Sequence, residues 1–97
     1  MPLYVELVNW TDQGVREAKD SVRRADAFIA AAERMGCKVH QLLWTMGTYD
    51  IVAITEAPND QTISALALCV AKLGNVRTLT MRAYTKAEME KIAQAIP

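Results

Sequence analysis

The sequence has 97 residues, enough for one domain spanning residues 1–97, and 52% of them are hydrophobic, which is more apolar surface than a domain of this size buries alone. Its eleven basic and eleven acidic residues balance, with no like-charge run longer than two, which argues against nucleic acid as a partner. No apolar stretch approaches the roughly 20 residues that cross a bilayer, and the N-terminus has no signal-peptide pattern, so we expect a cytoplasmic protein with no membrane partner.

The first half of the chain predicts a strand, a long helix and a second strand. Residues 3–10 (LYVELVNW) combine β-branched and aromatic residues, as strands do. Apolar residues then recur at three- and four-residue spacing through about Met35, which indicates a helix whose first turn breaks near Asp20–Ser21. Gly36 stands where a glycine would end that helix, and residues 37–45 (CKVHQLLWT) predict the second strand. The inward face of the helix is expected to contain Ala18, Ser21, Val22, Ala25, Phe28, Ile29, Ala32 and Met35.

The second half predicts two more strands and two more helices. Residues 49–56 (YDIVAITE) form a third strand, close enough to the second for an antiparallel hairpin. Pro58 cannot continue a central strand, and Asn59 or Asp60 can cap a helix that runs to about Leu73. Residues 76–84 (VRTLTMRAY) are the fourth strand. Residues 85–88 (TKAE) match a capping box and open a short C-terminal helix.

This order predicts an α+β fold of the ferredoxin-like βαββαβ type. Its four-stranded antiparallel sheet carries two helices on one face, and a short C-terminal helix follows. Two helices leave the other face of the sheet open, yet neither residues 3–10 nor residues 51–54 have a cleanly polar side. We therefore expect a homo-oligomer, a dimer or a trimer, that assembles through its sheets.

Three stretches of the sequence resemble the GYD-domain family, small bacterial proteins named for a Gly-x-Tyr-Asp corner. They are VNWTDQG (8–14), WTMGTYDIVAITEAP (44–58) and LGNVRTLTMRAYT (73–85). The resemblance extends over nearly the whole chain. It implies the dimeric α+β barrel superfamily, whose ferredoxin-like subunits associate through their sheets, and it implies no activity.

Several apolar residues stand where polar ones are expected. Leu79 and Leu42 depart in this way from the family pattern, Leu68 lies opposite the inward stripe of its helix, and Ala27 and Ala30 interrupt a polar helix face. Scattered apolar residues are normal on a surface. The alternative is a second protein–protein contact, natural or engineered, for which the candidate interface residues are Ala27, Ala30, Leu42, Leu68 and Leu79.

A small-ligand site would draw on aromatic residues at strand ends and on two arginines of the fourth strand. Such aromatics either plug barrel mouths and subunit interfaces or line a ligand pocket. Arg77 and Arg82 interrupt an apolar strand, where each forms a salt bridge or binds a small carboxylate. Asp50 bonds backbone N–H groups of the turn or serves as a functional carboxylate. The candidate ligand-binding residues are Trp10, Trp44, Tyr49, Asp50, Arg77 and Arg82.

The sequence gives little support for a catalytic site or a metal site. A structural zinc site needs four ligands, whereas the chain offers Cys37, Cys69 and His40, and the two cysteines are expected to be reduced and packed. His40 is expected at a surface or a sheet edge, without a recognisable orienting acid. Carboxylates that the sheet could bring together for acid–base work are Glu6, Asp50 and Glu56. We predict no catalytic residue, no metal and no cofactor, and favour a non-enzymatic role.

Three functions remain open from the sequence. The first is a homo-oligomeric domain without a known reaction, which assembles through its sheet face. The second is a binder of small anionic or aromatic molecules, or a minor enzyme of the isomerase or monooxygenase kind, as related folds suggest by analogy. The third is a building block of a larger assembly, natural or designed, that joins a second protein subunit through outward-facing helix residues.

Overall fold

A computed structural model of the chain describes all residues from 1 to 97 and confirms the predicted α+β, ferredoxin-like arrangement. Two long helices alternate with four strands, and shorter helical segments flank them. In chain order these elements are β1 (Leu3–Trp10), α1 (Asp12–Arg16), the 3₁₀ turn η1 (Ala18–Asp20), α2 (Ser21–Arg34), β2 (Lys38–Trp44), β3 (Ile51–Glu56), α3 (Asp60–Ala71), β4 (Val76–Ala83) and α4 (Lys86–Gln94).

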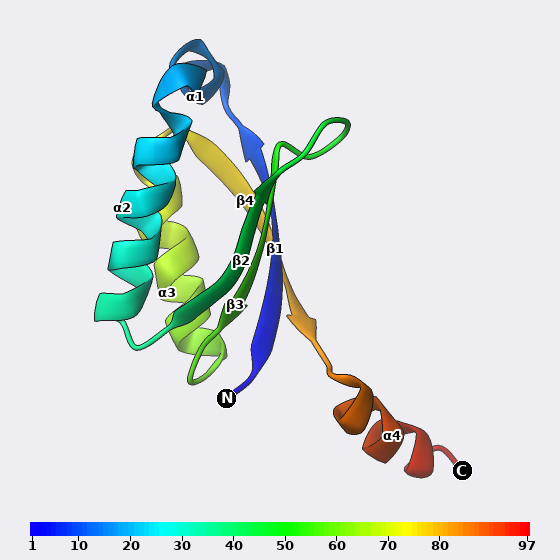
Figure 1. Cartoon of the computed structure of the whole chain (residues 1–97). Coiled ribbons are helices and arrows are strands. Elements are labelled where there is room, and N and C mark those ends of the chain that lie inside the picture. Colours follow the sequence, from blue (N-terminus) through cyan, green and yellow to red (C-terminus); the bar gives the residue numbers. More distant parts are fainter.

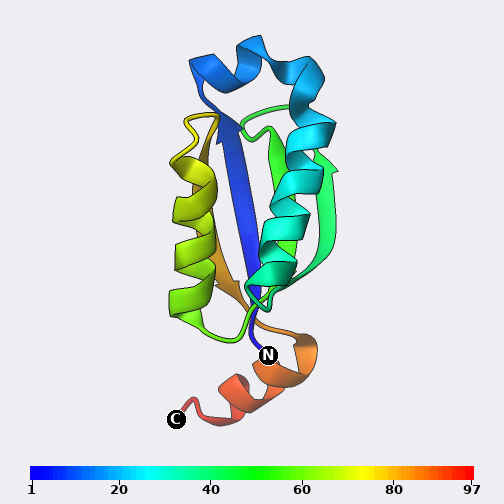
Figure 2. The same ribbon diagram turned by 90° about the vertical axis from the view of Figure 1, so that its left-hand side faces the viewer.

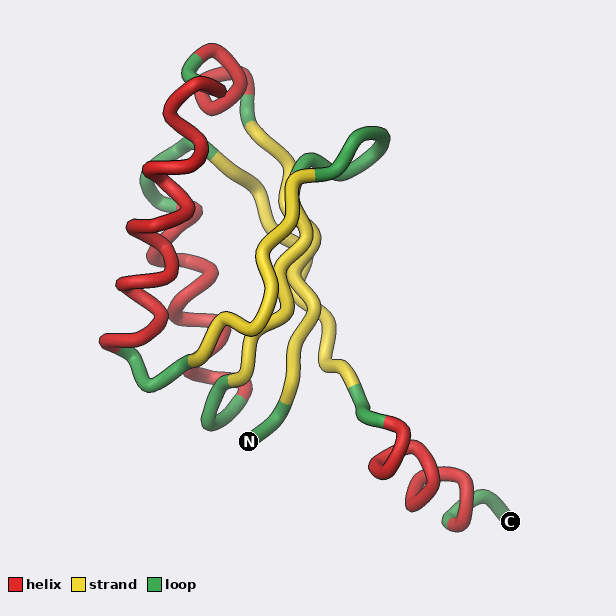
Figure 3. The backbone as a smooth tube through the Cα atoms, in the orientation of Figure 1, coloured by secondary structure: helices red, strands yellow, loops and turns green.

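The four strands form one antiparallel sheet in the order β2-β3-β1-β4, so β1 and β3 are central and β2 and β4 are edges. Helices α2 and α3 both lie on one face, which we call the inner face (Figure 1). The tube view shows the same two layers, with nothing covering the other, outer face (Figure 3). Seen from the helix side, α2 and α3 stand apart with β1 visible between them (Figure 2).

Local chemistry explains where the first helical segments begin and end. Thr11 caps α1, since its side-chain oxygen accepts a hydrogen bond from the Gly14 N–H at 3.1 Å. The predicted break near Asp20–Ser21 is confirmed, because η1 ends and α2 begins there. Gly36, with φ of +77°, ends the α2 segment in the left-handed region that favours glycine.

Two sequence predictions differ from the structure in detail. The third strand begins at Ile51, because the Asp50 N–H donates to the Val8 carbonyl at 2.9 Å and turns residues 49–50 into the corner. Val22 is 62% exposed, so its predicted place on the inward face of the helix is wrong. The face toward the sheet contains Ser21 and Ala25, and Val22 lies about 100° of helical rotation away from Ser21.

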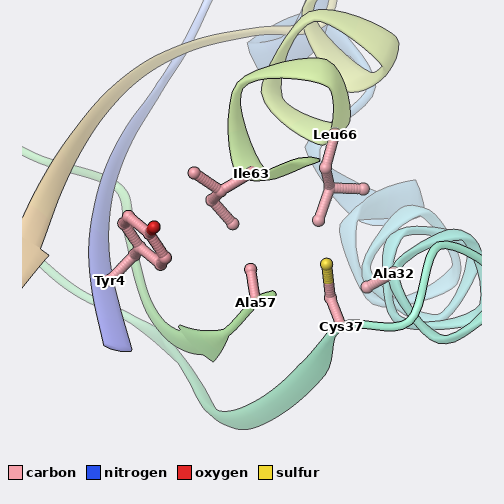
Figure 4. Packing of buried hydrophobic residues seen from close by; sticks show 6 residues of the cluster. All are labelled: Tyr4, Ala32, Cys37, Ala57, Ile63 and Leu66. Atoms are coloured by element: carbon pink, nitrogen blue, oxygen red, sulfur yellow. The ribbon is translucent and has the colours of Figure 1, made fainter. Parts of the chain in front are cut away.

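The hydrophobic core occupies the end of the inner layer near the start of β1. Its buried members are Tyr4, Ala32, Cys37, Ala57, Ile63 and Leu66, gathered from β1, α2, α3 and the adjoining loops (Figure 4). The Tyr4 hydroxyl donates to Asp60 Oδ1 at 2.5 Å, and this bond and burial together raise the pKa of Tyr4. Only 14 of the 97 residues are buried, so much of the apolar content stays at the surface.

The C-terminal helix α4 projects away from the sheet, on the side of the outer face (Figure 1). Its predicted capping box is confirmed: the Glu88 N–H donates to Thr85 Oγ1, and Glu88 Oε1 accepts from the Thr85 N–H at 3.0 Å. Met89, Ile92 and Ile96 follow at three- and four-residue spacing and are exposed. None of the helices combines the length and the apolar composition needed to cross a bilayer.

Candidate functional site

A cavity of about 190 Å³, which we call the inner cavity, lies between the sheet and helices α2 and α3. It adjoins the hydrophobic core but occupies the other end of the same layer. Its helix walls include Ala25 and Ala31 of α2 and Ala67 of α3. Because these methyl side chains are short, they leave space that Ile63 and Leu66 fill in the core half.

A buried carboxyl group lines the inner cavity. Glu6 is 2% exposed, and its Oε1 accepts a hydrogen bond from Thr55 Oγ1 at 2.7 Å. Its Oε2 has no hydrogen-bond partner in the chain. Burial raises the pKa of Glu6, and the Thr55 bond partly offsets that rise by favouring the carboxylate. The sequence signal for this site is a glutamate on the inner face of β1 between Tyr4 and Val8.

A buried polar atom without a hydrogen-bond partner lies beside Glu6. Thr80 of β4 is directly opposite Glu6 in the β1–β4 register, so both side chains face the helix layer. Thr80 Oγ1 is buried and has no hydrogen-bond partner. The Cys37 thiol borders this region from the core side, and its pKa is raised by burial and by the nearby Glu6. Of these groups Glu6 lines the inner cavity, and Thr80 lies behind its wall.

Four of the predicted ligand-binding residues lie near the end of the inner cavity closest to α1, but only Trp10 is one of its wall residues. Trp10 lines the cavity, and its backbone N–H donates to Asp50 Oδ2 at 2.9 Å. Trp44 donates from its Nε1 to the buried Ser21 Oγ at 2.7 Å, and Ser21 is also a wall residue. Tyr49 is half-buried in the adjoining corner. Asp50 thus binds a backbone N–H of β1, which ties the corner to the neighbouring strand.

The two candidate arginines lie elsewhere and apart from each other. Arg77 is exposed and pairs in register with Asn9, on the outer face. Arg82 lies at the opposite end of β4, with its guanidinium 4.6 Å from the centre of the Tyr84 ring and 3.4 Å from Glu88 Oε2. The structure therefore does not bring the six predicted ligand residues into one pocket.

The five candidate interface residues fall on three surfaces. Leu79 lies on the outer face of β4 and is 49% exposed. Leu68 on α3 and Ala30 on α2 are exposed on the helix layer. Ala27 is exposed at the margin of the inner cavity, and Leu42 is half-buried in its wall.

The outer face carries a continuous apolar surface, which we call the outer patch. Strand register aligns its side chains in two rows across the sheet. The rows are Met81, Val5 and Ile54, and Leu79, Leu7, Val52 and Leu43. Polar residues Asn9, Arg77, Gln41 and Lys38 border it. An apolar patch with a polar rim is typical of a protein-binding surface.

The remaining polar candidates do not assemble into a catalytic or metal site. The carboxylates of Glu6, Asp50 and Glu56 have separate partners. His40 lies on edge strand β2, and its Nε2 is 3.0 Å from Glu56 Oε1, a partner that the sequence did not reveal. The hydrogen bond to His40 lowers the pKa of Glu56. Both cysteines are free, and no three His, Cys, Asp or Glu side chains could hold a metal ion together.

Comparison with known proteins places the sequence in a family. The sequence model described as the GYD domain matches residues 4–93. The chain belongs to the GYD-domain family. This GYD protein is 29% identical over 90 residues to the "Glutamine synthetase and cystathionine beta-lyase binding protein" of Thermus thermophilus, a match that covers 92% of the chain and 95% of the relative. No solved structure matches the chain significantly.

Proposed function

We propose that this GYD protein is a non-catalytic protein-binding module that self-associates through its outer patch and binds a second protein, an enzyme. The outer patch carries the proposal. Its two rows of large apolar side chains remain open to water in one copy, and burying them against a second copy removes that cost. The polar rim would then stay solvated around a dry centre.

The C-terminal helix supports self-association independently. It projects on the same side of the sheet as the outer patch (Figure 1), and its apolar stripe of Met89, Ile92 and Ile96 is exposed. A specific interface buries about 800 Å² on each partner, so surface added beside the outer patch would strengthen self-association. The stripe of Met89, Ile92 and Ile96 would supply that surface by packing on the second copy.

The relative from Thermus thermophilus supports the second partner. Its printed name describes a protein that binds glutamine synthetase and cystathionine beta-lyase. For this chain we propose an enzyme partner of the same kind. With the outer patch covered by self-association, the helix layer is the surface left for it. Leu68 of α3, 70% exposed, is the most exposed large apolar residue of α2 and α3.

Sedimentation velocity over a hundredfold concentration range tests self-association. We expect the wild type to be a dimer or trimer, and Leu79→Lys with Met81→Lys on the exposed edge strand to give a monomer. Leu68→Lys on α3 is the matched control and should keep the wild-type mass. A wild type that stays monomeric throughout would overturn self-association, and dissociation by Leu68→Lys alone would move the interface to the helix layer.

Surface plasmon resonance tests the second partner. Glutamine synthetase and cystathionine beta-lyase from the source organism are immobilised, and this protein is passed over each. We expect saturable binding to at least one, weakened about tenfold or more by Leu68→Lys. Absence of binding to both would contradict the enzyme partner while leaving self-association to be judged by sedimentation.

A further inference from the structure

The inner cavity combines empty space with a directed polar group. Glu6 is almost fully buried, and its Oε1 is already bonded to Thr55 Oγ1 at 2.7 Å. Its Oε2 has no partner within the chain although the side chain lines the cavity. A largely buried acceptor without a partner is stabilised by any donor that reaches it. The carboxyl is therefore placed to receive a hydrogen bond from a molecule in the cavity.

The walls and the volume limit which molecule fits. Fourteen of the nineteen wall residues are hydrophobic, and the polar wall residues other than Glu6 stand mainly toward the end near Trp10. A dry apolar cavity of about 150 Å³ in another protein binds benzene, so about 190 Å³ accommodates one aromatic ring or a small fused ring. Glu6 and Arg24 are the only charged wall residues, and Arg24 already donates to the Gly14 carbonyl at 3.1 Å, so a charged or extended ligand would lose more hydration than these walls return.

We propose that the inner cavity binds a small, largely apolar ring compound carrying one N–H or O–H group, which donates a hydrogen bond to Glu6 Oε2. Thr80, which is opposite Glu6 in the β1–β4 register, has a buried Oγ1 without a hydrogen-bond partner. The cavity lies on the inner face and the outer patch on the opposite face of the sheet. Ligand binding is therefore separable from self-association.

Matched probes test this site by titration at pH 8, followed through the backbone amide NMR signals of Val8 and Ala53. Indole has one N–H, and benzofuran has the same shape with an oxygen in its place. We expect saturable shifts with indole and about tenfold weaker binding of benzofuran. In Glu6→Leu, which removes the acceptor and keeps the bulk, the two compounds should bind equally.

A second pair of variants tests the location. Ala67→Leu on α3 adds bulk inside the inner cavity and should weaken indole binding at least tenfold. Ala65→Leu, on the same helix and exposed, should bind indole like the wild type. If Glu6→Leu does not fold, two other results test the proposed site. They are the ratio of indole to benzofuran affinity in the wild type and the indole affinity of Ala67→Leu. Equal binding of both probes by the wild type, no saturable binding of indole, or equal loss in Ala65→Leu would overturn the proposal.

Discussion

Glu6 and Thr55 form a hydrogen-bonded pair inside the helix–sheet layer, with 2.7 Å between Thr55 Oγ1 and Glu6 Oε1. They project from the two central strands β1 and β3, and neither is more than 2% exposed. Burial disfavours the ionised carboxylate, and the threonine hydroxyl recovers only part of its lost hydration. The folded protein therefore binds the Glu6 proton more tightly than the unfolded chain does.

This pair predicts an unusual pH dependence of stability. Because the pKa of Glu6 is raised on folding, its contribution to the free energy of unfolding is fully present below the ordinary carboxyl value of about 4.5. That contribution falls as pH rises toward the raised pKa and is constant above it. Glu6→Gln removes this titration, so the stability of the variant relative to the wild type should increase with pH between about 4.5 and the raised value.

Urea unfolding from about pH 3 to about pH 8 measures this difference, and Glu56→Gln provides a control of opposite sign. His40 lowers the pKa of Glu56, so the wild-type advantage over Glu56→Gln should be present above about 4.5 and shrink as pH falls. A stability difference between Glu6→Gln and the wild type that does not change with pH would contradict the burial argument.

The order of elements could be predicted from the sequence because local chemistry determines it. Pro58 and the Asn59 cap separate β3 from α3, and the Asn59 side chain accepts from the Thr62 N–H at 2.9 Å as the cap requires. The capping box of Thr85 and Glu88 begins α4 in the same way. The open outer face followed from β1 and β3, whose alternate residues are apolar on both sides.

Two features could not be predicted from the sequence: which β2 side chains face the helices, and the inner cavity. A bulge at His40 shifts the register between Val39 and Gln41, so Val39 and Leu42 face the helices together although simple alternation puts them on opposite sides. The cavity depends on the distance between helix and sheet, which bulky core residues such as Ile63 set at the other end of α3. Alanines on a helix are compatible both with close packing against the sheet and with a cavity, so the sequence does not distinguish the two.

Gly14 is predicted to be the least replaceable glycine. A Cβ at this position would lie 1.9 Å from the Asn75 carbonyl oxygen, because Thr11 binds the same turn through its N–H and its hydroxyl. Gly14→Ala must push the α3–β4 turn away and should lower the free energy of unfolding by about 3 kcal/mol.

Gly47 provides the comparison for that measurement. Nothing lies within 4 Å of its added Cβ, but its φ of +106° disfavours any other residue. Gly47→Ala should cost about 1–2 kcal/mol in the same urea unfolding experiment. If Gly14→Ala costs no more than Gly47→Ala, the close approach of the two turns is not maintained in solution.

Asp50 is predicted to stabilise the fold through the Trp10 backbone. Its Oδ2 accepts the Trp10 N–H at 2.9 Å, which joins the Gly-x-Tyr-Asp corner to the end of β1. Asp50→Ala should lower the free energy of unfolding by about 1.5–3 kcal/mol, the range for hydrogen bonds to charged groups. Asp26→Ala, an exposed aspartate on α2 without such a bond, is the control and should change it by less than about 0.5 kcal/mol.

Thr85 is predicted to control the stability of α4 alone. Its hydroxyl accepts the Glu88 N–H at 3.2 Å, and α4 projects from the sheet, so losing the cap affects the helix and not the body of the protein (Figure 1). Thr85→Ala should cost the helix about 1 kcal/mol and speed amide hydrogen exchange in α4 about fivefold at low protein concentration. Lys86→Ala, one residue further along, should leave exchange unchanged. If α4 lies in the interface, its amides should exchange more slowly in both proteins at concentrations where copies associate. Exchange in α4 that does not change with protein concentration would contradict its packing on a second copy.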